Sequence, residues 1–305
     1  MKKAIITGAT GLVGSTVARY LASHGVSVLC LGRQPLDQAR VSSLFGNGVA
    51  YLNLNMDEVP ALAERMKKLS WSSDSETVFF HFAWRGQERL ADGSFSDQLD
   101  NAIHAAEAVR AAKMVGCARF VNAGTLEETF IESYLQGTRD EPYRSSQTNY
   151  ALAKLAARDT CKMVAYLEKI DYIHTRLSVP LAPDLSRGTY IALTLKKIAQ
   201  GKKYEAPQNE QLFDIVLTDD VARAYYLIGQ KGRNKADYFI GTSNPATLKQ
   251  YFAQFEQIVQ GVSIQLDKPI SDHHARFFDT HALHEDTGFV ASTGFQEIIQ
   301  RVSLA

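Results

Sequence analysis

Residues 1–25 read MKKAIITGATGLVGSTVARYLASHG, in which an apolar run leads through three glycines into a helical pattern. Gly8, Gly11 and Gly14 follow one another at three-residue spacing. Gly8 permits a tight turn after a strand, Gly11 leaves space for a pyrophosphate beside the backbone, and Gly14 lets the next helix pack close to the strand. We therefore predict a dinucleotide-binding turn, with a tight strand–helix turn that holds no ligand as the alternative.

The helix after this turn begins near Leu12 and Val13. The first backbone N–H groups of a helix have no partner within the helix, and the helix dipole is positive at this end, so phosphate binds there readily. For this reason the predicted cofactor site includes Leu12 and Val13.

Apolar runs and helical patterns alternate over the first two thirds of the chain. Continuous apolar runs of this length are typical of strands buried on both faces, as in a parallel sheet. The strand-like runs are 3–7, 26–31, 49–54, 77–83, 119–123 and 171–177, and the helical patterns are 13–24, 57–69, 98–116 and 146–168. This order predicts an α/β fold with a Rossmann-type doubly wound parallel sheet.

The alternation weakens after about residue 180. We expect a helix over 189–201, and a strand and a helix within 213–229 that return to the main sheet. The predicted division is a dinucleotide-binding domain over 1–178 and 211–240, and a smaller C-terminal substrate lobe over 179–210 and 241–305.

Composition narrows the class of protein. The chain has 305 residues, 45% of them hydrophobic, and equal numbers of basic and acidic residues, 33 each. Proteins that bind nucleic acid or anionic membranes usually carry a basic excess, so neither partner is expected. No apolar run approaches the roughly 20 residues of a membrane span. The start of the chain lacks the pattern of a signal peptide, and we expect a soluble cytoplasmic protein.

Cysteine and histidine usage gives no sign of a metal site. The three cysteines are scattered and form no CxxC pair. Four histidines stand near the C-terminus, but no cysteine or acid lies at ligand spacing among them. We expect no metal and interpret these as surface histidines: His273, His274, His281 and His284.

The second apolar run ends in CLGRQ, residues 30–34. In NAD-binding folds an acid near this position hydrogen-bonds the ribose 2′-hydroxyl. Gly32 and Arg33 stand there instead, and a guanidinium beside a small residue suits a 2′-phosphate. We predict NADP(H), with NAD as the alternative cofactor and a solvated loop arginine as the alternative reading of Arg33.

Tyr150 and Lys154 lie four residues apart in the helical pattern NYALAKLAARD, and so share one face. An ammonium group beside a tyrosine lowers the pKa of the phenol, which prepares it to exchange a proton with a carbonyl oxygen. Thr125 follows the strand RFVNA and Gly124, at the edge where parallel sheets bind ligands. Its hydroxyl group could hold the same oxygen. The alternatives are a buried tyrosine beside a solvated lysine, and a threonine that caps a turn.

Taken together, these motifs resemble a known family. TGATGxxG at the start, FHFAW at 80–84, a strand ending in Gly124 and Thr125, and the YxxxK of Tyr150 and Lys154 occur in the order of the extended short-chain dehydrogenase/reductases. The chain is most similar to their NAD-dependent epimerase/dehydratase branch, which acts mainly on nucleotide sugars. The resemblance runs through essentially the whole chain.

The resemblance implies roles for particular residues. Tyr150 would be the catalytic acid/base, Lys154 would tune it and bind the nicotinamide ribose, and Thr125 stands where the family has Ser or Thr. Asn53, Leu54 and Ala83 would contact the cofactor, and Asn101 matches a structural or relay asparagine. Family members often dimerise, here through 98–116 and 146–168, so a homodimer is expected.

Two departures from the family pattern bear on the substrate. Phe213 stands where many members carry an arginine that grips the substrate diphosphate. Leu126 stands where dehydratases of the family carry an aspartate, so dehydration is not expected. Other side chains are candidates for contacting the substrate, which we expect to be a nucleotide sugar: Trp84, Arg85, Glu127 and Arg187.

Four functions remain open on the sequence alone. The first is an NADP(H)-dependent reductase of a nucleotide-linked keto-sugar of the 4-keto-6-deoxy type. The second is a nucleotide-sugar epimerase, which reuses its own hydride. The third is a reductase of carbonyls that are not sugars, and the fourth is an NADP-binding sensor without chemistry. The complete set of Thr125, Tyr150 and Lys154 argues against the sensor.

Overall fold

The computed structural model describes residues 1–35, 49–86, 94–137, 148–185, 188–207, 211–261 and 273–292. A seven-stranded sheet forms its centre, in the order β10-β6-β5-β4-β1-β2-β3, and every neighbouring pair is parallel. The strands are β1 Lys3–Thr7, β2 Ser27–Gly32, β3 Val49–Asn53, β4 Thr77–His81, β5 Arg119–Ala123, β6 Asp171–Leu177 and β10 Asp237–Ile240. The predicted α/β fold and its doubly wound parallel sheet are confirmed.

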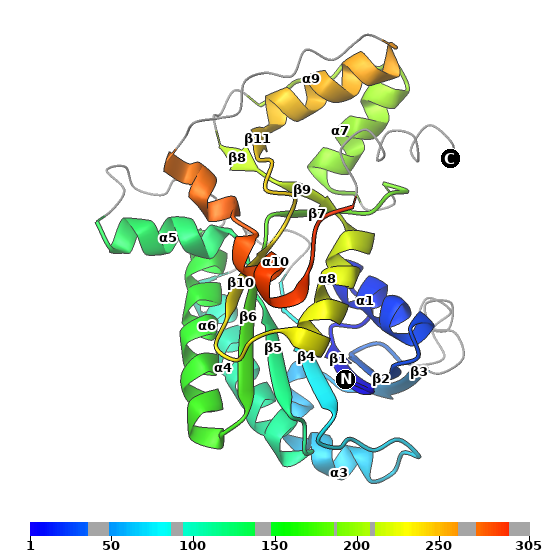
Figure 1. The fold of residues 1–305 in the computed structure, drawn as a ribbon, viewed down its shortest axis with the longest axis vertical. Helices are drawn as coiled ribbons and strands as arrows, with labels where there is room; N and C mark the ends of the chain where they lie inside the picture. The colour runs from blue at the N-terminus through cyan, green and yellow to red at the C-terminus, as the bar shows by residue number, and fades with distance from the viewer. Residues whose placement is uncertain are drawn as a thin grey trace.

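Helices cover both faces of this sheet (Figure 1). Alternate residues of β1 point to opposite faces: Ala4 and Ile6 pack into one core with helices α1 and α8, and Ile5 packs into another with α4 and α6. Small side chains let α4 and α6 approach closely, with Ala105 and Ala157 fully buried in that second core. The bounds of these helices are α1 Leu12–Ser23, α4 Phe95–Met114, α6 Thr148–Glu168 and α8 Thr218–Lys231.

The described residues include three shorter helical segments, two after β3 and one after β5. The helical pattern predicted over 57–69 is a 3-10 turn with Pro60 inside it, followed by one short helix. Asn55 and Glu58 cap this turn with reciprocal side-chain hydrogen bonds. The helix after β5 was not predicted. The bounds are η1 Met56–Ala61, α3 Leu62–Met66 and α5 Glu127–Leu135.

Most of the remaining elements form a smaller layer beyond the C-terminal ends of the strands, drawn at the top of Figure 1, whereas α10 (His281–Thr287) packs against α8 and β10. Helices α7 and α9 bury an apolar core there around Leu195, Phe252 and Phe255. The elements are β7 Val179–Leu181, α7 Tyr190–Ala199, β8 Leu212–Phe213, β9 Ile215–Leu217, β11 Ala246–Thr247, α9 Leu248–Val259, η3 His273–Phe278 and α10 His281–Thr287.

One predicted strand pairs differently. The apolar run after Phe213 was expected to return to the main sheet, but β9 pairs with β7 in a separate two-stranded sheet. The strand that extends the main sheet is β10, whose Asp237 lies opposite His174 of β6. The helix of this segment, α8, does return, and it packs against α1. The division into two domains stays a prediction.

No helix among the described residues combines the length and apolar character that crossing a membrane requires.

Candidate active site

In the turn between β1 and α1, the backbone segments approach so closely that side chains at Gly8 and Gly14 would not fit. Gly8 has a φ of +66°, and a Cβ there would lie 2.7 Å from the backbone nitrogen of Ala83. A Cβ on Gly14 would collide with the carbonyl oxygen of Gly8. No side chain caps α1, whose N-cap residue is Gly11. The N–H groups of its first turn, which begins with Leu12 and Val13, are therefore left for an anion.

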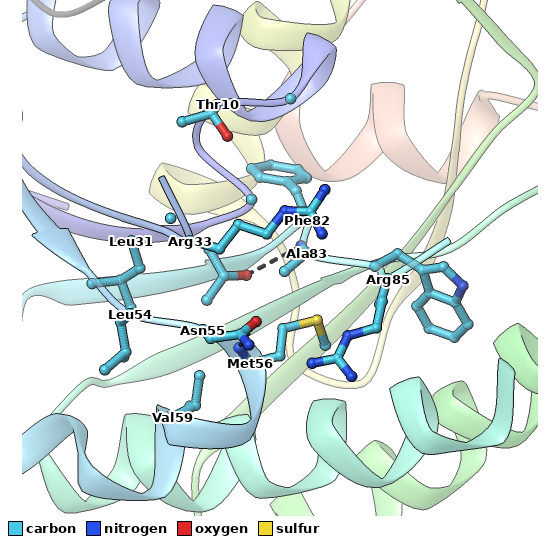
Figure 2. A pocket seen from close by; sticks show the side chains of 15 residues that line it. Thr10, Leu31, Arg33, Leu54, Asn55, Met56, Val59, Phe82, Ala83 and Arg85 are labelled. Carbon is cyan, nitrogen blue, oxygen red and sulfur yellow. Dashed lines mark hydrogen bonds between the residues drawn. The ribbon is translucent and has the colours of Figure 1, made fainter. Parts of the chain in front are cut away.

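A cavity of about 220 Å³ lies in front of this turn. Figure 2 shows its walls, which come from the glycine turn, the ends of β2 and β3, and the segment after β4. The Ala83 nitrogen, labelled in Figure 2 with this bond as a dashed line, donates a hydrogen bond to Thr7 Oγ1 at 3.2 Å. A glycine turn and an uncapped helix beside a cavity fit a dinucleotide. The lining residues include Gly8, Thr10, Gly11, Leu31, Arg33, Leu54, Asn55, Met56, Val59, Phe82, Ala83, Trp84 and Arg85.

The loop that carries Arg33 is held by β3. Tyr51 OH donates to the carbonyl oxygen of Gln34 at 2.7 Å, and a Cβ on Gly32 would lie 2.6 Å from that hydroxyl group. Asn53 Nδ2 donates to the carbonyl oxygen of Gly32 at 3.3 Å. Asn53 thus supports the loop from outside the cavity wall, while Leu54 lines the cavity.

Arg85 reaches the same cavity from the segment after β4 (Figure 2). Its backbone is fixed by the fully buried Asn101, whose Oδ1 accepts from the Arg85 nitrogen at 2.6 Å and whose Nδ2 donates to the Arg85 oxygen at 2.9 Å. None of the described residues that line the cavity is acidic, whereas Arg33 and Arg85 are both basic. The wall therefore offers positive charge to phosphate groups.

Trp84 joins this cavity to the predicted catalytic residues. Its indole N–H donates to Gln98 Oε1 at 2.8 Å. Its ring meets the Tyr150 ring edge to face, with centres 5.9 Å apart, and the Lys154 Nζ lies 3.9 Å from its centre. Such a cation–aromatic contact stabilises a desolvated ammonium group. Trp84, Tyr150 and Lys154 thus form one contiguous cluster.

Thr125 lies beside this cluster and is buried. It makes a side-chain hydrogen bond with Tyr150. Lys154 is buried as well, and its ammonium group donates to the carbonyl oxygen of Ala123 at 2.8 Å. The structure therefore brings Thr125, Tyr150 and Lys154 together at the C-terminal end of β5, where parallel sheets bind ligands.

The ionisation of these groups differs from the sequence-based expectation. Burial raises the pKa of Tyr150 above its ordinary value of 10.0, the Glu128 carboxylate raises it further, and the hydrogen bond with Thr125 lowers it. The expected low pKa of Tyr150 is therefore wrong for the protein by itself. Burial lowers the pKa of Lys154 to about 8, opposed by Glu128. For both groups burial is the largest cause of the change in pKa.

The segment after Thr125 contains one of the two departures noted in the sequence, Leu126. Leu126 is buried in an apolar cluster with Phe130, Phe239 and Phe278, so no acid stands at the position that dehydratases use. Glu127 begins α5, and its charge also raises the pKa of Tyr150. Its Oε1 accepts from Gln211 Nε2 at 3.5 Å.

The sequence profile of the NAD-dependent epimerase/dehydratase family matches residues 4–241 of this chain. The chain belongs to this family. The resemblance drawn from the motifs is confirmed, as is the expectation of an enzyme of the short-chain dehydrogenase type.

Solved structures share the fold of this family member. UDP-glucose 4-epimerase of Thermotoga maritima, in a structure with UDP-glucose, has 17% identity and a TM-score of 0.73, with 98% of this chain and 97% of that chain covered. A mutant UDP-glucuronic acid 4-epimerase of Bacillus cereus, with a fluorinated UDP-sugar and NAD, has 14% identity and a TM-score of 0.74, covering 99% and 98%. The Bordetella bronchiseptica enzyme WbmF, with NAD⁺ and UDP, has 15% identity and a TM-score of 0.73, covering 99% and 91%.

Several residues of the site were not predicted. Asn55 and Met56 line the cavity and begin η1, and Phe82 and Val59 close it from two sides. The spacing of Asn55 and Glu58 is a capping signal that could have located the start of this turn. The contact of Trp84 with Lys154 joins distant segments and has no local signal. Arg187, predicted to contact substrate, lies outside the described residues.

The described residues contain no group of three histidine, cysteine or acidic side chains that could hold a metal ion. His281 pairs with Glu285 at 3.1 Å on the surface, and His284 Nδ1 lies 3.1 Å from the carbonyl oxygen of Phe289.

Proposed function

We propose that this chain is an NADP(H)-dependent reductase of a nucleotide-linked keto-sugar, of the 4-keto-6-deoxy type. The observation that carries the proposal is the cluster of Thr125, Tyr150 and Lys154 beside a cavity that Arg33 and Arg85 line. Thr125, Tyr150 and Lys154 are suited to hold a carbonyl oxygen and to exchange a proton with it. The absence of an acid among the described lining residues supports NADP(H) over NAD.

The proton step can be assigned to Tyr150. A bound nicotinamide supplies the hydride. The phenol of Tyr150 donates its proton to the carbonyl oxygen as the carbonyl carbon gains the hydride, so the C=O π bond becomes an O–H and a C–H bond. Because its pKa is raised, Tyr150 stays protonated until that step. The hydroxyl group of Thr125 holds the same oxygen, and Lys154 returns a proton toward the phenolate.

A second candidate function is epimerisation of a nucleotide sugar. It is supported by the shared fold with two UDP-sugar 4-epimerases, one of which is in complex with NAD. An epimerase keeps its nicotinamide and shows no net redox change, whereas a reductase consumes NADPH with each turnover. The same residues would serve both reactions, because the phenolate left after Tyr150 has given its proton to a carbonyl oxygen is the form that takes a proton from a sugar hydroxyl group in the reverse step.

Incubation of the purified protein with NADPH and a panel of nucleotide keto-sugars tests this proposal. A reductase depletes the NADPH absorbance one-for-one with product formed. Interconversion of two sugar nucleotides at constant absorbance would make the protein an epimerase. Conversion only of carbonyl compounds that are not sugars would contradict the proposal and make the protein a reductase of such compounds. Conversion of nothing in a broad panel would contradict it too, and would favour a sensor.

A homodimer through α4 and α6 is part of the proposal. These helices pack side by side on one face of the sheet and expose large apolar side chains: Ile103, Met114, Met163, Tyr166 and Leu167. Sedimentation analysis of the wild type and of Met163→Glu tests it, with a dimer expected for the first and a monomer for the second.

A cytoplasmic location is also proposed. All three cysteines are free and buried, which is usual in a reducing compartment. Fractionation of cells that express the protein tests this location.

A further inference from the structure

A carboxylate and an imidazole are buried together beneath Thr125. Glu128 is fully buried and His174 is 2% exposed. Their Oε2 and Nε2 atoms lie 2.8 Å apart. The other oxygen of Glu128, Oε1, accepts a hydrogen bond from the backbone nitrogen of Thr125 at 2.8 Å. The proposed reaction does not itself use this pair, and burying such groups is costly unless they have partners.

The lack of a side chain at Gly124 leaves space for Glu128 and His174 beside the backbone. A Cβ on Gly124 would collide with Glu128 Oε1 and with His174 Nε2. Gly124 has no left-handed φ that would by itself require glycine, so the close approach of these two side chains explains the residue. The glycine before Thr125 therefore belongs with Glu128 and His174 as one arrangement.

The surroundings of His174 determine which nitrogen carries its proton. Asn122 Nδ2 lies 3.3 Å from His174 Nδ1, and it also donates to Tyr172 OH at 3.3 Å. The tautomer with its proton on Nε2 satisfies both contacts, because Nδ1 can then accept from the Asn122 amide while Nε2 donates to Glu128. Both oxygens of Glu128 then accept from N–H donors, which is the arrangement of a carboxylate.

Lys154 is hydrogen-bonded to the same short segment. Its Nζ donates to the carbonyl oxygen of Ala123, two residues before the Thr125 nitrogen that donates to Glu128. We propose that Glu128 is a positioning residue that holds Thr125 and supplies the buried negative charge opposite Lys154, and that His174 fixes its carboxylate. This inference rests on the roles proposed above for Thr125, Tyr150 and Lys154.

The electrostatic consequence concerns two protons. Glu128 raises the pKa of Lys154 against the lowering effect of burial. It also raises the pKa of Tyr150. The carboxylate thus keeps the lysine cationic and the tyrosine a neutral phenol, which is the pair of states that proton donation to a carbonyl oxygen requires.

Other titratable groups face this pair from each neighbouring element. Burial and, after it, the charge of Lys154 lower the pKa of His81. Burial lowers the pKa of Lys154, and Glu128 and then Cys161 raise it. Glu128 contributes to raising the pKa of Tyr172, after burial and Cys161. The groups to be considered are His81 on β4, His104 on α4, Glu127 on α5, Tyr150 and Cys161 on α6, and Tyr172 and His174 on β6.

The fluorescence of Trp84 reports the charge on Lys154 without any substrate. The chain has two tryptophans, so Trp71→Phe leaves Trp84 as the only one, with the Lys154 ammonium 3.9 Å from its ring centre. In this background we expect the emission to change with pH around a midpoint near 8, and the change to vanish in Lys154→Met. Glu128→Gln keeps the size of the side chain and removes its charge, and should lower the midpoint by about one pH unit.

Glu132→Gln is the matched control. Glu132 lies one turn further along α5 and pairs with Arg158 at 2.7 Å, so its loss removes a carboxylate from the helix but not from the cluster. Its midpoint should equal that of the Trp71→Phe parent. Equal midpoints in Glu128→Gln and Glu132→Gln would overturn the proposal. If Glu128→Gln does not fold, His174→Leu removes one of the two donors that hold the negative charge, and an unchanged midpoint there has the same meaning.

Turnover provides the second readout, with any accepted substrate. In Glu128→Gln the alkaline limb of the kcat profile should move down by about one pH unit, together with the fluorescence midpoint. A merely structural role would lower kcat at every pH and leave the limb in place, which would contradict the proposal. The fluorescence titration needs no substrate, so it can succeed where the proposed reaction fails, and the two failures are distinguishable.

Discussion

The ammonium group of Lys154 lies 3.9 Å from the centre of the Trp84 ring, and Trp84 also lines the cavity in front of the glycine turn. One indole therefore contacts both the predicted catalytic lysine and the predicted cofactor site. An aromatic face stabilises a desolvated cation by up to about 2 kcal/mol, but it cannot take over the proton. Trp84 is thus suited to hold Lys154 in place without changing its chemistry.

We expect Trp84→Leu to lower turnover by roughly tenfold, as the loss of such a contact implies, and Trp84→Phe to lose less because it keeps an aromatic face. Steady-state kinetics of the two variants measure this difference. Trp71→Phe is the control, since the indole N–H of Trp71 donates a hydrogen bond to Ser27 Oγ and Trp71 does not line the cavity. Equal losses in the leucine and phenylalanine variants would show that the aromatic face has no part in the effect.

Tyr150→Phe removes the phenolic hydroxyl and keeps the ring that meets Trp84 edge to face. General acid–base catalysis by one side chain contributes typically about 10²- to 10⁴-fold, and we expect turnover to fall by that amount while NADPH affinity stays within about twofold. Tyr134→Phe, on the exposed side of α5, is the control. Full activity of Tyr150→Phe toward an accepted substrate would show that Tyr150 is not the proton donor.

Gly14→Ala tests the glycine turn. The added methyl group would collide with the carbonyl oxygen of Gly8, so the turn must open to accept it. Overpacking of this kind costs about 1–3 kcal/mol, and we expect a matching loss of stability in urea and a weaker binding of both NADPH and NADH. Gly188→Ala is the control, because nothing lies within 4 Å of a Cβ there. Unchanged cofactor affinity in Gly14→Ala would show that the turn does not hold the dinucleotide.

The elements that could be predicted from the sequence are those with a local signal. The runs that form β1, β2, β4, β5 and β6 are apolar on both faces, and each was located within two residues. The glycine turn could be predicted equally well, because three closely spaced glycines between a strand and a helix are typical of a dinucleotide-binding turn.

Elements whose partners are distant in the sequence were missed or misplaced. The segment EETFIESYL of α5 has no clear helical stripe, and its anchors come from elsewhere, through Glu132 with Arg158 and Glu128 with His174. The apolar run of β9 is as strand-like as the others, but only its pairing with β7 shows that it leaves the main sheet. The cluster of Trp84, Tyr150 and Lys154 likewise depends on how β4 and α6 come together.

His81 is expected to make the free energy of unfolding depend on pH in the acidic range. The Nδ1 atom of this buried imidazole is hydrogen-bonded to Thr7 Oγ1 at 2.9 Å. Burial is the main cause that lowers the pKa of His81 from 6.5 to about 3, and the charge of Lys154 is the second. Below pH 6.5 the unfolded chain takes up a proton that folded His81 does not, so the free energy of unfolding falls as pH decreases toward 3. The slope from one such group is about 1.4 kcal/mol per pH unit.

His81→Asn keeps a polar atom near Thr7 and cannot titrate, so we expect the free energy of unfolding to fall less steeply between pH 6.5 and about 4.5, by up to about 1.4 kcal/mol per pH unit. Urea denaturation at a series of pH values measures the slope. Phe79→Leu, a buried substitution on the same strand, controls for a weakened fold and should change the stability equally at each pH. Parallel curves for His81→Asn and the wild type would exclude His81 as the source.

Arg33 is expected to decide the cofactor. Tyr51 and Asn53 hold the loop beneath it through the backbone of Gln34 and Gly32, so the guanidinium is presented at the cavity from a fixed base. The side chain is exposed in the protein alone, and solvent weakens ionic contacts at such positions. We therefore take the lower end of the range for hydrogen bonds to a charged group, about 1.5 kcal/mol, which corresponds to roughly tenfold in affinity.

Calorimetric titration of NADPH and NADH into the wild type, Arg33→Ala and Arg19→Ala tests this expectation. The wild type should bind NADPH more tightly than NADH, and Arg33→Ala should lose about tenfold for NADPH while its affinity for NADH, which has no 2′-phosphate, stays nearly constant. Arg19 is exposed on α1 and does not line the cavity, so Arg19→Ala shows what the loss of one surface charge does by itself. Equal affinities of the wild type for the two cofactors would contradict the predicted preference for NADP(H) and weaken the case for a reductase over an epimerase.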